Sequence, residues 1–107
     1  MFIKNQSFKD EETLLDAMFD FNIGTVSDYT QQLIAEIDKQ LEAHEEYKNY
    51  RDSLPDEDDK VGLYTEERDL RLAEMLMERF DSFLIKDAKL YGVKDAEKTV
   101  LYEIDMV

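Results

Sequence analysis

Carboxylates are the residues of this sequence whose types and spacing could do chemistry. Glu42 and Glu45 stand three residues apart, with Glu46 beside them, and Glu78 and Asp81 stand three apart further along the chain. In a helix, a spacing of three places both side chains on one face. Two such pairs on antiparallel helices would supply oxygen ligands for a magnesium ion that binds a triphosphate.

This ExxE and ExxD pattern resembles that of the all-α nucleotide pyrophosphatases of the MazG and dimeric dUTPase type. The resemblance covers only the two segments that carry the acidic pairs. It implies that these acids are metal ligands and that the protein is an oligomeric helical hydrolase. A magnesium-dependent nucleoside triphosphate pyrophosphatase is therefore an alternative function for the chain.

Other metal and nucleophile chemistry finds little support in the residues. His44 is the only histidine, so no site with two histidine ligands can form, and the absence of cysteine excludes disulfides and thiol catalysis. Leu41 stands three residues before His44, where a di-iron bundle would need a glutamate. We expect His44 to lie at the edge of the core, and we expect no catalytic residue and no cofactor.

The acidic stretch "SLPDEDDKVG" could be read as a calcium loop. Asp56, Asp58 and Glu67 fall on the first, third and twelfth positions of an EF-hand. Lys60 occupies the fifth position, where it cannot bind a cation, and Val61 occupies the sixth, where the turn requires glycine. We therefore expect a solvated connector between two helices and no metal site.

Charge is the unusual property of the sequence. Its 27 acids and 13 lysines and arginines give a net charge of −14 over 107 residues. Between Asp10 and Glu46 there are eleven acids and one base, Lys39. Such a field repels nucleic acids and anionic membranes and attracts basic proteins. We expect a basic protein as partner, and no direct binding to nucleic acid or membrane.

The acids of the N-terminal half recur at helical spacing without lysines between them. Like charges at this spacing destabilise an isolated helix, and neighbouring turns place them about 5–6 Å apart, comparable with phosphates along a nucleic-acid strand. This predicts an acidic face that mimics nucleic acid. The expected contact residues are Glu12, Asp16, Asp20, Asp38, Glu42, Glu45 and Glu46.

Three helices and a short β element are expected to position these side chains. Apolar residues at spacings of three and four predict helices from Ser7 or Asp10 to Asn22, from Thr25–Ser27 to Ser53, and from Thr65 to Gly92. Alternation from Thr99 to Met106 predicts a strand, and "MFIKN" is a second candidate strand. The expected fold class is α+β and mostly α, with the second and third helices as an antiparallel hairpin and a terminal two-stranded β element.

The buried faces follow from the same spacing. The first helix is expected to bury Leu14, Leu15, Met18 and Phe19, and the third helix buries a stripe from Leu70 to Ala88. Tyr47, Tyr50 and Tyr64 are expected to gather as partial core near the second connection. Because Leu72, Met75 and Met77 make the third helix apolar on more than one side, they also fit a homodimer interface.

Residues 1–107 are expected to form a single small acidic helical domain. The favoured function of this domain is that of a non-enzymatic acidic protein-binding module. The specific hypothesis is a nucleic-acid mimic that inhibits a basic nucleic-acid-binding protein, as small anti-restriction and anti-CRISPR proteins of phages do; the analogy rests on charge. A third alternative is an oligomeric structural or adaptor module. The apolar runs are too short to span a bilayer and the N-terminus lacks a signal-peptide apolar region, so we expect a cytoplasmic protein.

Overall fold

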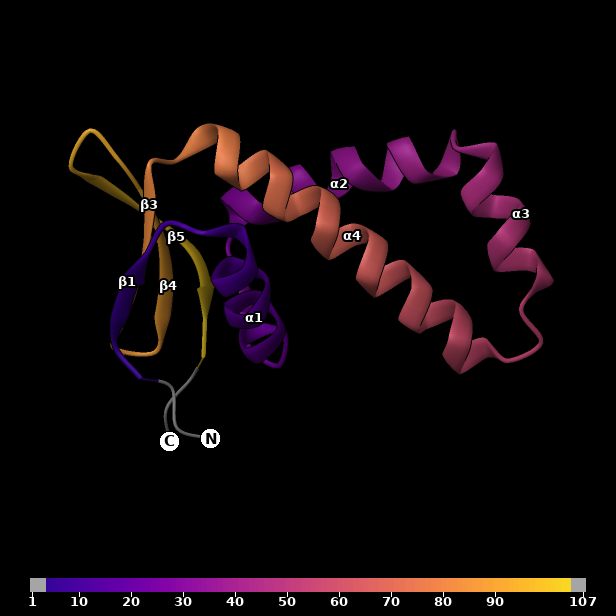
Figure 1. The fold of residues 1–107 in the computed structure, drawn as a ribbon, viewed down its shortest axis with the longest axis horizontal. Helices are drawn as coiled ribbons and strands as arrows, with labels where there is room; N and C mark the ends of the chain where they lie inside the picture. The colour runs from indigo at the N-terminus through magenta and orange to yellow at the C-terminus, as the bar shows by residue number, and fades with distance from the viewer. Residues whose placement is uncertain (1–3, 105–107) are drawn as a thin grey trace.

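Residues 4–104 fold into four helices and a five-stranded antiparallel sheet, as described by a computed structural model (Figure 1). In chain order the elements are β1 (Gln6–Phe8), α1 (Glu11–Phe21), β2 (Thr25–Val26), α2 (Asp28–Glu42), α3 (Glu45–Ser53), α4 (Glu57–Arg79), β3 (Ser82–Lys86), β4 (Lys89–Lys94) and β5 (Glu97–Glu103). The expected fold of three helices and a two-stranded element is therefore wrong in both helix number and sheet size.

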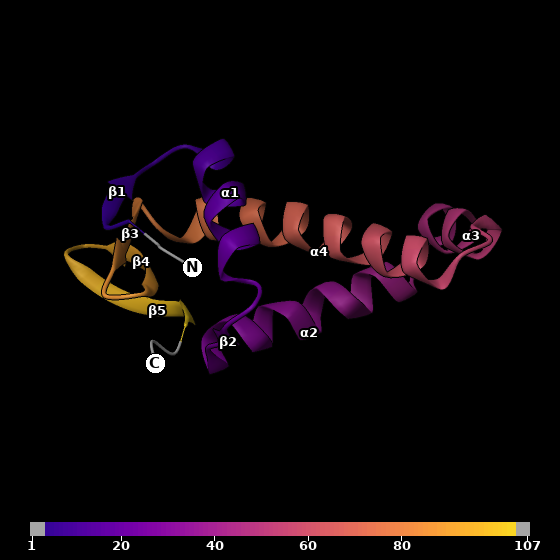
Figure 2. The same ribbon diagram turned by 90° about the horizontal axis from the view of Figure 1, so that it is seen from below.

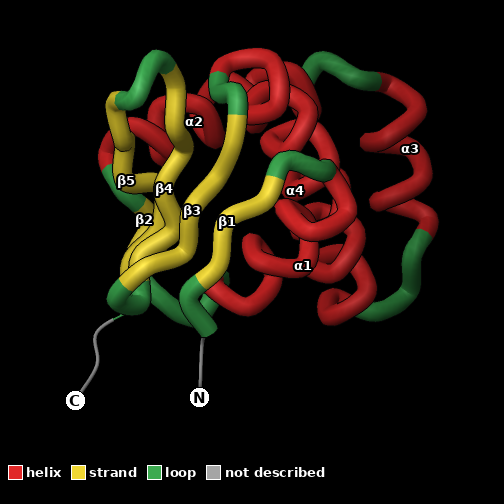
Figure 3. The backbone as a smooth tube through the Cα atoms, turned by 60° about the vertical axis from the view of Figure 1, so that its left-hand side comes forward, coloured by secondary structure: helices red, strands yellow, loops and turns green. Residues whose placement is uncertain are grey.

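The sheet has the strand order β1-β3-β4-β5-β2, and every neighbouring pair is antiparallel. The strands β3, β4 and β5 follow one another along the chain and form a meander. The short strands β1 and β2 extend its two edges by pairing with β3 and β5. The helices lie on one side of this sheet (Figure 3). Two separate edge pairings thus replace the expected ribbon between the termini, of which residues 1–3 and 105–107 lie outside the described part.

The first helix lies where the sequence predicts it, and Leu14 and Met18 are buried as expected, but its buried face is shifted away from Phe19. Asp10 caps α1 by accepting a hydrogen bond from the backbone N–H of Thr13 at 2.9 Å, whereas Ser7 lies in β1. The hydrogen bonds from Thr13 hold the pKa of the Asp10 carboxyl below its usual value. The buried face consists of Leu14, Ala17, Met18 and Phe21. Phe19, expected in the core, is 74% exposed.

The expected second helix is two helices, because the chain turns at His44. α2 ends at Glu42, and His44 caps α3 by accepting a hydrogen bond from the backbone N–H of Tyr47 on its Nδ1 atom at 3.1 Å. α2 and α4 pack against each other as expected of a helical pair. The connection between them runs through α3, so they do not form a direct hairpin (Figure 2).

The expected third helix is displaced toward the N-terminus. α4 begins at Glu57, with Asp56 at its N-cap position, so the acidic stretch read as a connector supplies the first helical turn. Negative charge there is favourable because it faces the positive end of the helix dipole. α4 ends at Arg79, and the residues expected to continue it to Gly92 form β3 and most of β4 instead.

The core lies between the sheet and the three helices α1, α2 and α4. The side chains that α4 buries in it all belong to its second half: Leu72, Ala73 and Leu76. The first half extends beyond the sheet, where α3 and the end of α2 accompany it (Figures 1 and 2). The largest fully buried side chains are those of Leu14, Met18, Phe21, Thr30, Ile37, Leu41, Leu72, Leu76, Phe83, Leu90, Leu101 and Tyr102.

Two alanines occupy turn positions that favour glycine. The two-residue turns of the meander are Asp87-Ala88 and Asp95-Ala96, and all four residues have positive φ, between 52° and 66°. Positive φ at both central residues is the geometry of a type I′ hairpin turn, which matches the twist of the strands. An alanine in this region carries a steric penalty that glycine lacks.

Replacing the exposed Ala96 by glycine is expected to raise the free energy of unfolding by about 0.5–1 kcal/mol, because it removes the positive-φ penalty. Ala35→Gly is the matched control: Ala35 is also exposed but lies inside α2, where glycine should destabilise by about 1 kcal/mol. Urea denaturation followed by circular dichroism measures both changes. Equal destabilisation by the two substitutions would contradict the assigned turn geometry.

Candidate functional site

The seven acids expected to contact a partner fall into two separate groups. Glu12, Asp16 and Asp20 lie on α1, beside the sheet. The remaining four lie on the second half of α2 and the start of α3 and are called here the distal group: Asp38, Glu42, Glu45 and Glu46. Figure 1 shows α3 at the end of the molecule away from the sheet. The structure therefore does not join the seven acids into a single stripe.

The acids of α1 form an exposed row without nearby cations. Glu12, Asp16 and Asp20 are all exposed, and their spacing of four places them on neighbouring turns of one face. None of the ion pairs found within residues 4–104 includes any of the three. This row, called here the α1 acidic row, retains the property that the sequence predicts for the whole N-terminal half.

Asp38 in the distal group is held by a tyrosine of α4. The Tyr64 hydroxyl donates a hydrogen bond to Asp38 Oδ1 at 2.6 Å. Burial, followed by this hydrogen bond to a carboxylate, raises the pKa of Tyr64 to about 12. The phenol therefore stays protonated at neutral pH and continues to donate. Tyr64 is thus part of the contact between α2 and α4.

Two further distal acids have cationic partners. Arg51 Nη1 lies 3.3 Å from Glu42 Oε1, because the turn at His44 folds α3 back toward the end of α2. Lys48 Nζ lies 4.0 Å from Glu45 Oε1. Exposed pairs of this kind contribute little to stability, but they reduce the local negative charge. The expectation of an acidic face without bases is therefore wrong for Glu42 and Glu45.

The acidic pairs proposed for magnesium lie at different ends of the fold. Glu42, Glu45 and Glu46 surround the junction of α2 and α3, while Glu78 lies at the end of α4 next to the sheet and Asp81 follows it (Figure 1). Within residues 4–104, no group of three or more histidines, aspartates and glutamates is arranged to hold a metal ion. One chain thus does not assemble the two pairs into a single site.

The residues at the EF-hand positions of the sequence also lie mostly in a helix, whereas a calcium site of this type requires a loop. Asp58 and Glu67 both lie in α4, nine residues apart. Side chains nine residues apart in a helix are separated by about 13 Å along its axis. The EF-hand spacing of the sequence therefore does not correspond to a calcium-binding loop.

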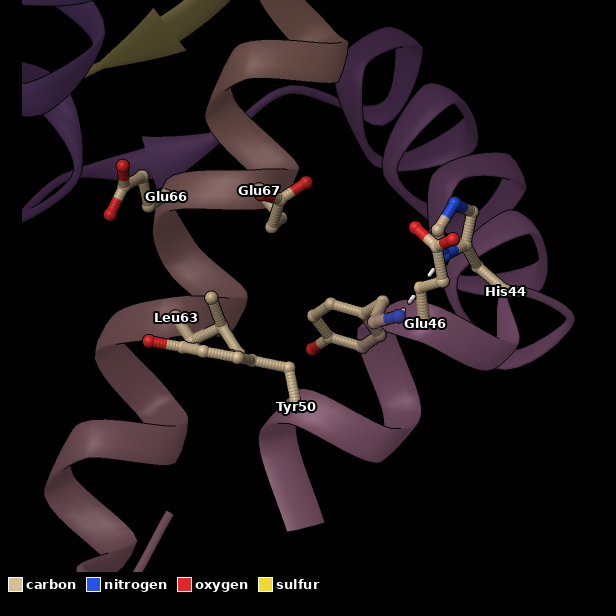
Figure 4. A pocket seen from close by; sticks show the side chains of 7 residues that line it. His44, Glu46, Tyr50, Leu63, Glu66 and Glu67 are labelled. Carbon is tan, nitrogen blue, oxygen red and sulfur yellow. Dashed lines mark hydrogen bonds between the residues drawn. The ribbon is translucent and has the colours of Figure 1, made fainter. Parts of the chain in front are cut away.

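A hollow of about 560 Å³ separates α3 from α4, and is called here the α3–α4 hollow (Figure 4). Its wall combines carboxylates with two tyrosine rings. Tyr47 is buried beneath it, whereas Tyr50 is 58% exposed. The lining residues are His44, Glu46, Tyr47, Tyr50, Leu63, Glu66 and Glu67. Of these, Leu63 was expected in the connector, whereas Glu66 and Glu67 were expected at the start of the third helix, and no hollow was predicted between the two helices.

A second hollow of about 500 Å³ lies between α1 and α4, and is called here the α1–α4 hollow. Its apolar members include Phe19 and Leu70, which are 74% and 39% exposed. Its lining residues are Leu15, Phe19, Gly62, Thr65, Glu66, Asp69 and Leu70, so Glu66 borders both hollows. Because spacing predicts core positions for Leu15, Phe19 and Leu70, this surface was not expected from the sequence.

The α1 acidic row adjoins the α1–α4 hollow. Phe19 follows Asp16 by three residues and Glu12 by seven, spacings that place side chains on the same side of a helix. A large exposed ring thus stands beside carboxylates that lack cationic partners. This combination of apolar and acidic groups suits a ligand that is both apolar and cationic.

No family model, curated protein or solved structure matches this chain. Among the helices of residues 4–104, none combines the length and apolarity needed to cross a membrane.

The residues named for a homodimer do not form an exposed patch. Leu72 has no exposed surface, and Met75 and Met77 are partly buried against the same core. The apolar side chains that do reach the surface include Phe19, Ile23, Tyr50, Val61 and Leu70. An interface of this protein would have to use such residues, several of which line the two hollows.

Proposed function

We propose that this protein is a non-enzymatic, cytoplasmic module that binds a basic protein partner through the α1 acidic row. The observation that carries the proposal is that Glu12, Asp16 and Asp20 are exposed, lie one turn apart and have no ion-pair partner within the described chain. Such a row destabilises its own helix slightly, and a cationic partner would relieve that repulsion.

Electrostatics favours a basic partner over other classes. The net charge of −14 accelerates encounter with positively charged proteins and repels nucleic acids and anionic surfaces. We place Glu12, Asp16 and Asp20 at the centre of the contact. Glu46 lines the α3–α4 hollow, and Asp38, Glu42 and Glu45 are secondary because a tyrosine or a cation already contacts each of them.

A nucleic-acid-binding protein is the partner class that we propose within this group. Its basic groove is built for rows of negative charge, and its binding to a mimic would weaken with added salt, as its binding to DNA does. If this is correct, duplex DNA added in excess should compete with the acidic module for the partner. Competition that is absent at every salt concentration would leave a basic partner of another class.

The proposal predicts that Asp16→Lys/Asp20→Lys abolishes partner capture while the fold is retained. Both side chains are exposed and unpaired in the described structure, so reversal should remove attraction without removing a stabilising contact. Capture from nuclease-treated lysate onto immobilised protein, at low and at physiological salt, measures the effect. Circular dichroism checks the fold.

The matched control is Glu74→Lys/Glu78→Lys, which makes the same charge change at the same spacing on α4. Glu74 and Glu78 are also exposed and outside the ion pairs described for residues 4–104. Capture should survive in this control at physiological salt. Equal loss in both double variants would show that only net charge matters, and equal retention would refute the proposal.

A further inference from the structure

We infer that the α1–α4 hollow seats one amphipathic, basic helix of the partner, with an apolar side chain between Phe19 and Leu70. The inference rests on the proposed function and specifies the shape of the partner segment. It is carried by three observations: the exposed apolar lining of the hollow, an unexplained glycine in its wall, and the charge around it.

The α4 wall of the hollow extends for about two helical turns and carries one large apolar side chain, that of Leu70. Gly62, Thr65, Glu66, Asp69 and Leu70 recur at spacings of three and four, which places them along one side of the helix over eight residues, or about 12 Å. Two turns of a partner helix have the same length. An amphipathic helix that lies in a groove between helices presents its apolar side chains at this same spacing.

Phe19 is the anchor on the opposite wall. It is 74% exposed, although a phenylalanine side chain gains more than most from burial. Leu15, one turn earlier, is partly buried against the core and forms the floor beside it. The hollow thus offers a fixed apolar floor and an exposed ring that a partner side chain can cover.

Gly62 supplies an independent observation. It lies inside α4, where glycine is less favourable than alanine, and its φ is not positive. A Cβ atom built at this position would meet nothing within 4 Å. Neither the backbone conformation nor the packing of the described chain therefore requires glycine. A glycine lets another backbone approach closely because it has no side chain, and Gly62 lies in the wall of the hollow where a partner helix would pack.

Charge selects a basic helix among the occupants that an apolar groove could take. Glu66 borders the groove on α4, and the α1 acidic row lies beside Phe19. Asp69 contributes less, because Arg68 Nη2 lies 3.1 Å from its Oδ1 atom. A second copy of this chain carries the same charge of −14 and would be repelled. Lysines and arginines flanking an apolar stripe complement both parts of the surface.

The test uses three synthetic peptides of about 18 residues, which as helices span about 27 Å. The first contains leucine, lysine and arginine, with leucines at spacings of three and four. The second has the same composition in an order that removes the apolar face. The third keeps the leucine spacing but replaces every basic residue by glutamate. Fluorescence anisotropy at physiological salt measures binding, and we expect the first peptide to bind at least about tenfold more tightly than either other.

Substitutions that leave the net charge unchanged distinguish the contribution of the groove to peptide binding from the contribution of charge. Phe19→Ser should weaken binding of the first peptide about tenfold. Gly62→Ala should weaken it while raising the midpoint of thermal unfolding, because the added methyl group improves the helix and blocks the approach. Tyr50→Ser, which removes an exposed aromatic of the other hollow, should leave binding unchanged. Circular dichroism of each variant confirms the fold.

The possible failures are distinguishable. Equal binding of the first two peptides, or full binding to Phe19→Ser and Gly62→Ala, would overturn the groove while leaving charge-dependent partner capture intact. Binding of the acidic peptide, or self-association of the chain that Phe19→Ser abolishes in sedimentation, would assign the groove to another occupant and overturn the inference. If Asp16→Lys/Asp20→Lys captures the partner normally, the proposed function itself fails.

Discussion

Replacing Leu72 by alanine is expected to lower the free energy of unfolding by about 2–5 kcal/mol. Leu72 has no exposed surface and lies in the half of α4 that packs into the core. Truncation removes buried apolar surface and leaves a cavity that neighbouring side chains fill only partly. A domain of this size has a stability of about 5–15 kcal/mol, so the loss is a large share of the total. The midpoint of urea denaturation measures it.

Leu70→Ala is the matched control for this prediction. It makes the same chemical change two residues earlier on the same helix. Because Leu70 is 39% exposed, its replacement should lower the free energy of unfolding clearly less than Leu72→Ala does. The pair also tests the dimer interpretation of the sequence, in which Leu72 lies at an interface. If Leu72→Ala leaves unfolding of the single chain unchanged and instead halves the mass measured by sedimentation equilibrium, the interface interpretation is right and its core position is wrong.

Sequence spacing predicts helices over α1, α2 and part of α4, but it merges α2 with α3 and misassigns both ends of α4. Phe80, Phe83 and Leu84 fit helical spacing of three and four, and this pattern predicts a helix as far as Gly92. Phe83 and Ile85 also fit the spacing of two that a strand requires, and in β3 they are the buried residues. Short apolar runs are ambiguous in this way, and flanking turn signals usually decide between the alternatives.

The two hairpin turns of this chain lack the glycine that usually marks such turns in a sequence. Hairpin turns with positive φ normally contain asparagine, aspartate or glycine, and the expected pairs end in glycine. This chain instead uses Asp-Ala twice, at Asp87-Ala88 and Asp95-Ala96. Both pairs follow a lysine, so the short repeat Lys-Asp-Ala was the available clue. Without glycine in the turns, the sequence contained no clear signal of where one strand ends and the next begins.

The candidate surface was predictable in its charge but not in its shape. Spacing alone predicts that Glu12, Asp16 and Asp20 share one face of a helix, and they do. It could not predict that Arg51 returns to Glu42, because that contact depends on the turn at His44. A histidine cap produces this turn, and histidine is not among the residues that commonly mark the start of a helix.

The exposed Phe19 illustrates a further limit of pattern reading. Both Phe19 and Phe21 are possible core residues of an eleven-residue helix, since each lies at helical spacing from Leu14 or Leu15. The sheet decides between them, because the buried Phe21 ring lies 6.4 Å from the Tyr102 ring of β5. Sequence spacing contains no information about that distant strand. The ring that remains outside is the one on which the docking inference depends.

Replacing Gly92 by alanine is expected to destabilise the fold by about 1–3 kcal/mol, because it overpacks the sheet. Gly92 lies in the central strand β4, and a Cβ atom there would lie 2.6 Å from Cγ of Phe80. The ring cannot move away easily, since it packs edge-on against Tyr29 at 5.8 Å and against Phe83 at 6.2 Å between ring centroids. Urea denaturation measures the loss.

The cause can be isolated by a double-mutant cycle with Phe80→Ala. If the clash with the ring produces the cost, Gly92→Ala should be nearly neutral in the Phe80→Ala background, and the two substitutions should be strongly non-additive. Gly62→Ala serves as the opposite control: nothing lies within 4 Å of its Cβ position, so it should stabilise α4 by about 0.5–1 kcal/mol. Additive effects of Gly92→Ala and Phe80→Ala would instead mean that Gly92 is required by the strand backbone and not by the ring that covers it.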